Sequence, residues 1–312
     1  MGAFSAMDNP AWKASIRAMI RPAVLSLTLA AALLGCQQDK QNPNWDKSGP
    51  QTMGASSSTS KAPSGSVEDR LARVERKLDK ITDFLKQAVP PKLDETATYG
   101  VPIDKSDPVV GPADAKVTIV EAYEFLCPYC AMVAPTVDQL LAEYPKDVRV
   151  AYKYFLIHGE PAMPSGQAAC AAHKQGKYKE YEAALWKRSW PNPGGGPANK
   201  DALTAEAVVG LAGELGLDTT KFKADMDGEC KEWLSRSMRT LQQFGAGGTP
   251  SFYVNGRFVQ AGNPAAFKRV IDEEIKKADE AIKGGIKQAD YYEKVVVGKG
   301  EKEAKMVSPF DE

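Results

Sequence analysis

Two cysteines lie three positions apart in the stretch EAYEFLCPYCAMVAP, residues 121–135. Cys127 and Cys130 are separated by Pro128 and Tyr129. Such a pair can supply part of a metal site, brace the fold as a structural disulfide, or carry electrons through a reversible disulfide. The residues around the pair distinguish between these three chemistries.

The flanking sequence places this pair at the start of a helix. An apolar, strand-like run precedes it at residues 116–125, and AMVAPTVDQLLAEY after it has a helical pattern. Unpaired backbone N–H groups at a helix N-terminus stabilise an anion, so we expect a lowered pKa at Cys127. The thiolate is the form that attacks disulfides. We therefore predict that Cys127 attacks and that the more shielded Cys130 resolves the mixed disulfide.

A metal site is the main alternative. One CxxC supplies only two ligands, and zinc takes four. Cys170 and Cys230 have no CxxC partner, although His173 follows Cys170 by one helical turn and leaves a half-site conceivable. The chain has only 2 histidines, so we expect no metal and no cofactor. A purely structural disulfide is disfavoured because Pro128 and Tyr129, at a strand-to-helix junction, suit an exposed redox turn.

Composition excludes little but is informative about partners. The chain has 312 residues, of which 43% are hydrophobic and 26% charged, enough for one core with appendages. Lys+Arg and Asp+Glu are both 40, so the net charge is zero and nothing indicates a nucleic-acid partner.

The N-terminal region has the pattern of a secretory signal. A short apolar run over residues 23–36 follows several basic residues and is too short for a confident membrane span. Its end, LLGC, resembles the bacterial lipobox, which implies cleavage after residues 1–35, lipid attachment to Cys36 and export. An unlipidated signal peptide is the alternative. The lipobox resemblance also implies the outer membrane, because Gln37 and not an aspartate follows the lipid site. Translation can begin at any of three methionines, Met1, Met7 and Met19.

A linker and an amphipathic helix follow. Residues 36–65 are rich in polar residues, Ser, Gly and Pro, which predicts a flexible tether. Residues 66–91 then carry apolar residues at alternating spacings of four and three, which predicts a coiled coil. Leucine at heptad position a with β-branched residues at d favours a homo-trimer or tetramer through residues 66–88. The alternative is that this helix packs on its own globular domain.

The remaining chain is predicted to form an α/β domain. A second strand is expected at 148–157, helices over 162–244, and a hairpin at 249–262 that turns at Asn255-Gly256. A closing helix ends near residue 283. We expect no clear core role for the lysine-rich tail, residues 284–312, which holds one further helix around 289–297.

VTIVEAYEFLCPYC, together with the downstream GTPSFYVNG, resembles the DsbA-type thioredoxin fold of thiol:disulfide oxidoreductases. The resemblance covers residues 100–283, with a helical insertion at about 160–244. It implies that Glu121 is a buried acid that takes up the proton of the resolving cysteine, with Lys153 as its charge partner. A surface glutamate on an edge strand is the alternative for Glu121. The resemblance also implies that Pro250 is a cis-proline beside the Cys127–Cys130 disulfide.

Substrate contacts and the direction of electron flow are inferred from the same resemblance. It implies that substrate contacts come from residues around the pair and the cis-proline, namely Phe125, Pro128, Tyr129, Met132 and Thr249. CPYC resembles the active sites of DsbG and ScsC, and Thr249 matches the isomerase and reductase side. We therefore expect an isomerase or reductase that acts on exported proteins and is recycled by a membrane redox partner, in the periplasm-facing cell envelope.

Two other functions stay open. A DsbA-like disulfide oxidase is the first alternative. The second is a lipid-tethered, non-catalytic module that binds peptides through an apolar rim of Phe125, Tyr129, Met132 and Phe252. Oxidising surroundings and an even cysteine count also favour a structural disulfide between Cys170 and Cys230, with two buried thiols as its alternative.

Overall fold

The structure is a computed structural model, and it describes residues 65–89, 91–192, 196–260 and 264–308. The predicted signal peptide, the lipidated Cys36 and all of the linker before Gly65 lie outside the described residues.

Helix α2, Val67–Ala88, is the predicted amphipathic helix. Its start is capped reciprocally, because Ser66 Oγ accepts from the Asp69 N–H (3.2 Å) and the Asp69 carboxylate accepts from the Ser66 N–H (3.1 Å). No residue of α2 is buried. Its heptad residues are between 38% and 73% exposed, namely Val67, Leu71, Val74, Leu78, Ile81 and Leu85. The apolar stripe is therefore open to solvent in the described part of the chain.

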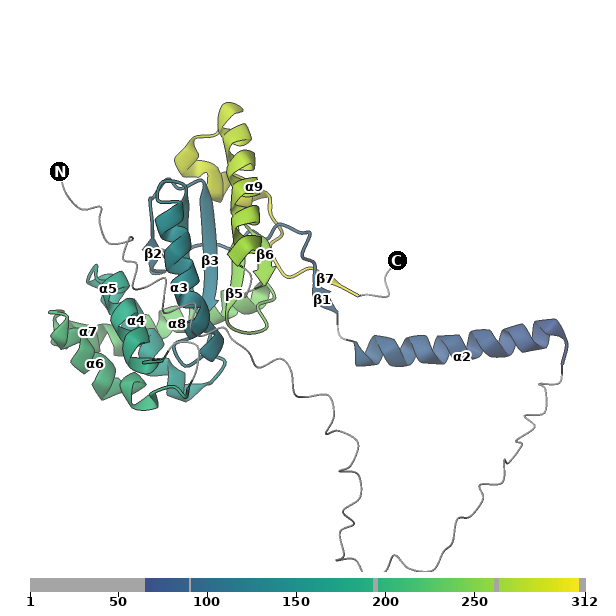
Figure 1. Ribbon diagram of the computed structural model, residues 1–312, viewed down its shortest axis with the longest axis horizontal. Helices are drawn as coiled ribbons and strands as arrows, with labels where there is room; N and C mark the ends of the chain where they lie inside the picture. Colours follow the sequence, from purple (N-terminus) through teal and green to yellow (C-terminus); the bar gives the residue numbers. More distant parts are fainter. Residues whose placement is uncertain (1–64, 90, 193–195, 261–263, 309–312) are drawn as a thin grey trace, which may run out of the picture. The chain divides into compact units, whose positions relative to one another are not determined.

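A five-stranded sheet in the order β2-β4-β3-β5-β6 carries the rest of the fold (Figure 1). β3 and β4 are parallel, and the other neighbouring pairs are antiparallel. All seven residues of β3 are buried, which accounts for its nearly continuous apolar sequence. The strands are β2 (Val109–Val110), β3 (Val117–Tyr123), β4 (Val148–Tyr154), β5 (Ser251–Val254) and β6 (Arg257–Gln260).

The two faces of the sheet have different coverings. Ile119 and Tyr123 share a core with α3 (Pro128–Glu143), α9 (Pro264–Lys283) and the helical insertion. Val120 and Ala122, which alternate with them, face the end of the insertion and the C-terminal tail. The position of a residue in β3 therefore decides which of two environments its side chain meets.

The insertion between β4 and β5 contains more, shorter helices than its sequence pattern indicates. The run around residue 176 forms two helices, because Gly176 adopts a left-handed φ of +72° that ends the first. Gly228, whose φ is −101°, lies between the last two helices. The elements are η1 (Glu160–Ala162), α4 (Met163–Lys174), α5 (Tyr178–Ser189), η2 (Lys200–Leu203), α6 (Ala205–Glu214), α7 (Thr219–Asp227) and α8 (Glu229–Gln243).

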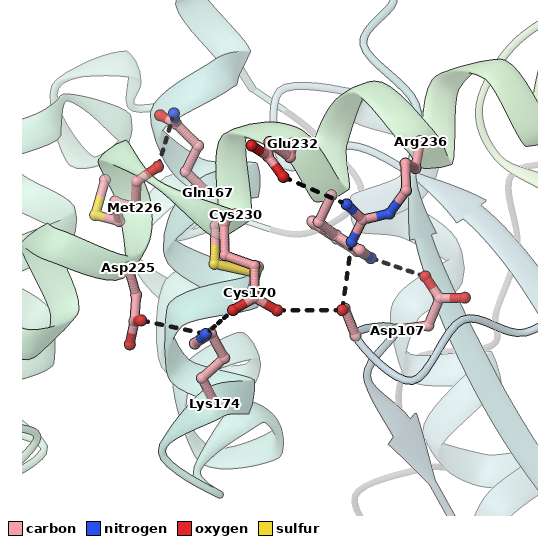
Figure 2. Close-up of a disulfide and its surroundings, with 12 residues drawn as sticks. Asp107, Gln167, Cys170, Lys174, Asp225, Met226, Cys230, Glu232 and Arg236 are labelled. Atoms are coloured by element: carbon pink, nitrogen blue, oxygen red, sulfur yellow. Dashed lines mark hydrogen bonds and ion pairs between the residues drawn. A yellow bond between two sulfur atoms is a disulfide. The ribbon is translucent and has the colours of Figure 1, made fainter.

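A disulfide joins the first and last helices of this insertion (Figure 2). Cys170 on α4 and Cys230 on α8 have Cα atoms 5.6 Å apart and are separated by 60 residues in sequence. Beside it, Lys174 pairs with Asp225 (3.3 Å) and with Glu229. Because Cys170 is bonded to Cys230, it cannot form the half-site with His173 that the sequence left open.

The hairpin of β5 and β6 turns at Asn255 and Gly256, as its sequence predicts. Both residues have positive φ values, +43° and +81°, which Asn and Gly adopt most readily. The Asn255 side chain accepts from the Thr118 N–H (2.8 Å) and donates to the Lys116 carbonyl (3.0 Å), which ties the turn to β3.

The expectation that the tail has no core role was wrong. β7 (Met306–Val307) pairs with β1 (Lys92–Leu93), and η3 (Gln288–Asp290) leads into a π-helical turn, η4 (Tyr292–Val297). Tyr292 is buried and its hydroxyl donates to the Val101 carbonyl (2.7 Å). The aromatic residues of the tail cover the sheet face opposite to α3, so this segment completes the core despite its many lysines.

We expect Tyr292→Ala to lower the free energy of unfolding by about 3 kcal/mol, because it removes a buried aromatic ring. Urea unfolding of the disulfide-intact protein measures this. Tyr129→Ala, at a side chain that is 67% exposed, is the control and should change stability by less than about 0.5 kcal/mol. Equal effects of the two substitutions would contradict the assigned packing.

Candidate active site

Cys127 is the N-cap of α3, and Pro128 is the first helical residue. Proline fits there because the first N–H of a helix has no intrahelical partner. The pKa of the Cys127 thiol is lowered to about 6. The largest cause is a hydrogen bond from Cys130, and the backbone N–H groups of Cys130 and Tyr129 add to it, while burial opposes it. Cys127 can therefore be a thiolate near neutral pH.

Cys130, one turn into the helix, has the opposite character. It is fully buried, and burial raises its pKa well above the ordinary value. The hydrogen bond to Cys127 raises it further. Both thiols are free in this structure. The pair thus consists of one activated sulfur and one that holds its proton.

A second segment, some 120 residues further along the chain, lies beside this pair. Cys127 Sγ lies 3.3 Å from the Thr249 carbonyl oxygen, and the Thr249-Pro250 peptide bond is cis. The Thr249 hydroxyl is buried, and its interaction with the Cys127 sulfur is a further cause of the lowered pKa of Cys127. Pro250 has no N–H of its own. Backbone groups of this segment thus lie next to the Cys127 sulfur.

Glu121 lies on β3 and is 3% exposed. Burial raises its pKa well above the ordinary value, and the negative charge of Glu182 raises it further. A carboxyl group in this state is a stronger base than a solvated one. Its charge also contributes to the raised pKa of Cys130, which places the two groups within electrostatic reach.

The expected pairing of Glu121 with Lys153 was wrong. Glu121 is in register with Tyr152, whereas Lys153 is in register with Ala122, on the other face of the sheet. There Lys153 forms a buried ion pair with Asp107 (2.5 Å). The charged groups that act on Glu121 instead come from α5 and α3, namely Glu182, Lys179 and Asp138.

The expected apolar rim is only partly on the surface. Tyr129 and Met132 are 67% and 57% exposed, but Phe125 and Phe252 are fully buried. Phe125 packs on Trp186, with ring centroids 4.5 Å apart, and Phe252 packs on Phe267 at 4.9 Å. These two phenylalanines therefore build the core beneath the site and cannot contact a substrate directly.

A cleft of about 370 Å³ lies beside α3, between it and α5. Its lining includes Ala131, Trp186 and Trp190. The Trp190 indole N–H donates to the Phe125 carbonyl (2.8 Å), which fixes this wall to the turn before Cys127.

Sequence analysis missed a second buried acid, Glu124. It is fully buried and accepts hydrogen bonds from the N–H groups of Ile157 and His158 (both 3.1 Å), and it pairs with the His158 ring. Its own carbonyl accepts from the Cys127 N–H (3.1 Å). Glu124 thus ties the turn before Cys127 to the loop after β4. The signal that could have found it is a second glutamate three residues before Cys127.

Comparison with known proteins places the chain in a family. The thioredoxin family model matches residues 104–273. The chain belongs to the thioredoxin family. The predicted DsbA-type thioredoxin fold is thereby confirmed, and BdbD from Bacillus subtilis shares it, with a TM-score of 0.50 and 21% identity over 58% of this chain and 98% of that one.

Two curated relatives extend the comparison. A probable disulfide bond formation protein D from Bacillus cereus is 28% identical over 54% of this chain and 78% of its own length. The Na(+)/H(+) antiporter NhaA of Herminiimonas arsenicoxydans is 34% identical over 50% of this chain, but the match spans only 24% of that antiporter. Among the residues that the structure describes, no helix has the length and apolar character needed to cross a membrane.

We expect alkylation of the reduced protein by iodoacetamide to follow the ionisation of Cys127. Because the pKa is lowered to about 6, the rate should rise to a midpoint near that pH and be level above about pH 8, whereas an ordinary thiol reaches its midpoint near 8.5. Mass spectrometry of samples quenched at each pH measures the rate and the site. Cys130→Ala removes the largest stabilising hydrogen bond and should move the midpoint upward. A native midpoint near 8.5 would contradict the assignment.

Proposed function

We propose that this protein is a thiol:disulfide oxidoreductase in which Cys127 is the nucleophile and Cys130 the resolving cysteine. The observation that carries the proposal is the opposite shift of the two pKa values within one CxxC turn. The relative from Bacillus cereus, whose name gives it a role in disulfide bond formation, supports the same chemistry.

In the reducing direction, the Cys127 thiolate attacks one sulfur of a substrate disulfide. The substrate S–S bond breaks, one substrate sulfur leaves as a thiolate, and a mixed disulfide forms. Cys130 then loses its proton to the Glu121 carboxylate and attacks Cys127 Sγ. The substrate's second sulfur leaves, and the enzyme ends with the Cys127–Cys130 disulfide. The oxidising direction reverses these steps.

Substrate binding is proposed at the surface around the nucleophile. Pro128, Tyr129 and Met132 are exposed on the first turn of α3 and offer apolar contacts. The segment at Thr249, which contacts Cys127 Sγ through its carbonyl, offers backbone groups to an extended peptide. Exported proteins that contain thiols or disulfides are the substrates we propose.

For the direction of electron flow we propose isomerase or reductase activity, on the basis of the Pro128-Tyr129 dipeptide between the cysteines and of Thr249. A disulfide oxidase is the second candidate, and two observations favour it. A thiolate with a pKa of about 6 stabilises the reduced enzyme, which makes its disulfide more oxidising, and the Bacillus cereus relative is named for disulfide formation. Equilibration of the CPYC pair with glutathione buffers, followed by mass spectrometry, discriminates between them. A strongly oxidising pair would favour the oxidase.

We also propose that the protein faces the periplasm, attached to a membrane through lipid on Cys36, and that a membrane redox partner recycles the pair. The LLGC motif and the preceding apolar run support the anchor. Metabolic labelling with a palmitate analogue, compared between the native chain and Cys36→Ser, tests it. Equal labelling of the two would contradict lipidation at Cys36.

We expect Cys127→Ser to abolish reduction of insulin, because no other sulfur in the site is ionised near neutral pH. Cys130→Ser should instead accumulate mixed disulfides with substrate, because the resolving step is lost. Non-reducing gels with and without dithiothreitol measure the trapped species. If Cys127→Ser traps substrate and Cys130→Ser does not, the two roles are reversed. If Cys127→Ser keeps peptide binding and the native chain has no turnover, the non-catalytic binding module is correct.

We further propose that α2 joins three or four copies of the chain through its exposed apolar stripe. Leu78→Asp, which places a charge in this stripe, should convert the oligomer to a monomer, because a buried unpaired carboxylate is costly. Light scattering of the chain without residues 1–36 measures the mass. Lys80→Asp, on the polar face, is the matched control and should leave the mass unchanged. A native monomer would contradict the proposal.

A further inference from the structure

The segment that leads into the cysteine pair is a single tight turn. The chain leaves β3 at Tyr123 and enters α3 at Pro128. Between them the Cys127 N–H donates to the Glu124 carbonyl (3.1 Å), which closes the turn. Within the described part of the chain, no side chain caps the start of α3. The position of the Cys127 sulfur therefore depends on the contacts that hold this turn.

Two neighbouring side chains hold the middle of the turn. The Tyr154 hydroxyl, at the end of β4, accepts from the Phe125 N–H (3.2 Å). The Trp190 indole N–H donates to the Phe125 carbonyl (2.8 Å). Both backbone groups of Phe125 are thus fixed by the surrounding structure. The first residue of the turn, Glu124, is fixed in a different way, through its side chain.

The Glu124 carboxylate is fully buried and bonded to the segment that follows β4. Its Oε1 atom accepts from two consecutive backbone N–H groups, those of Ile157 and His158, both at 3.1 Å. Successive backbone N–H groups provide a suitable place for an anion. A buried carboxylate without such donors is costly, so these contacts fix the side chain in one position.

The other carboxylate oxygen of Glu124, Oε2, pairs with the ring of His158. The His158 side chain is 39% exposed, whereas that of Glu124 is 0% exposed. His158 is therefore bonded to both oxygens of the buried acid, to one through its backbone N–H and to the other through its ring. Among the described residues, it makes more contacts with this carboxylate than any other.

We propose that His158 is a positioning residue for thiol exchange, which acts through Glu124 on Cys127. Its ring and its N–H hold the Glu124 carboxylate, and the Glu124 carbonyl holds the Cys127 N–H. The Cys127 sulfur then lies 3.3 Å from the Thr249 carbonyl oxygen, at the start of α3. Each link in this series is a direct contact between described residues. This inference rests on the proposed exchange function.

The positioning acts on the stability of the Cys127 thiolate. Hydrogen-bond donors at a helix start stabilise an anion only when the anion lies close to them. The backbone N–H groups of Tyr129 and Cys130 act on the Cys127 sulfur in this way. If the turn loses its support, the sulfur moves away from these donors and the thiolate becomes less favourable. His158 transfers no atom or proton in this scheme, so the balance of the exchange reaction is unchanged.

The test is the pH dependence of Cys127 alkylation in the full chain. His158→Ala removes the ring and should move the midpoint upward by about one pH unit, the order expected when a hydrogen bond to an ionised group is lost. Alkylation near pH 6 should slow severalfold. His158→Asn, whose side-chain N–H lies near the position of Nδ1, should restore most of the native midpoint. Mass spectrometry identifies the alkylated cysteine, and thermal unfolding of each variant is measured in parallel.

Variants at Glu124 test whether the effect passes through this residue. Glu124→Gln keeps an acceptor for both backbone N–H groups and an N–H for the ring, so its midpoint should stay near the native one. Glu124→Ala should shift the midpoint at least as far as His158→Ala, and the double variant should shift it no further. If Glu124→Ala does not fold, the two His158 variants decide the question alone, because that side chain is partly exposed. Glu160→Gln, at an exposed side chain, is the matched control and should keep the native midpoint.

The outcomes are distinguishable. A native midpoint in His158→Ala, with or without a loss of thermal stability, would overturn the positioning role and leave the exchange function intact. Equal shifts in His158→Ala and His158→Asn would also overturn it, because the contact with Glu124 would then not be the cause. A native chain that is alkylated at Cys127 near pH 6 but never reduces insulin would overturn the proposed function instead, since alkylation needs no substrate.

Discussion

The site depends on how burial and the hydrogen bonds at the start of α3 act in opposite directions on the pKa of each thiol. Both thiols of the CxxC are removed from water, which disfavours their ionised forms. At Cys127, donors from the helix end and from Cys130 outweigh that cost, while Cys130 has no comparable compensation. Two identical groups three positions apart thus differ in reactivity because β3 ends and α3 begins between Tyr123 and Pro128.

The sheet determines which charged side chains lie on the same face as the cysteine pair. Side chains alternate along β3 and β4, so a single position decides whether a charged group meets the helices α3 and α5 or the opposite layer. Glu121 is on the first side, and Lys153 on the second, where Asp107 neutralises it. The pKa of Glu121 therefore depends on charged groups of the helical insertion as well as on its burial in the sheet.

Contacts from the insertion and the tail support the segments that form the site. Glu124 and Trp190 hold the turn before Cys127 from two sides, and the Cys170–Cys230 disulfide joins the first helix of the insertion to its last. On the far face, Tyr292 packs beneath the sheet.

The sequence alone determined the fold, the strand–helix order around the cysteine pair and the positions of the hairpin and the closing helix, because these follow from local pattern and from two specific motifs. It favoured the Cys170–Cys230 disulfide, which the structure contains, but it did not assign charge and packing partners correctly across the fold. Lys153, Phe125, Phe252 and the tail were misjudged because their environment depends on which face of the sheet or which neighbouring helix they meet. Only the tertiary structure decided that charged groups of α5 and α3 act on Glu121, since these groups share no local pattern with it and belong to elements that come together only in the folded chain.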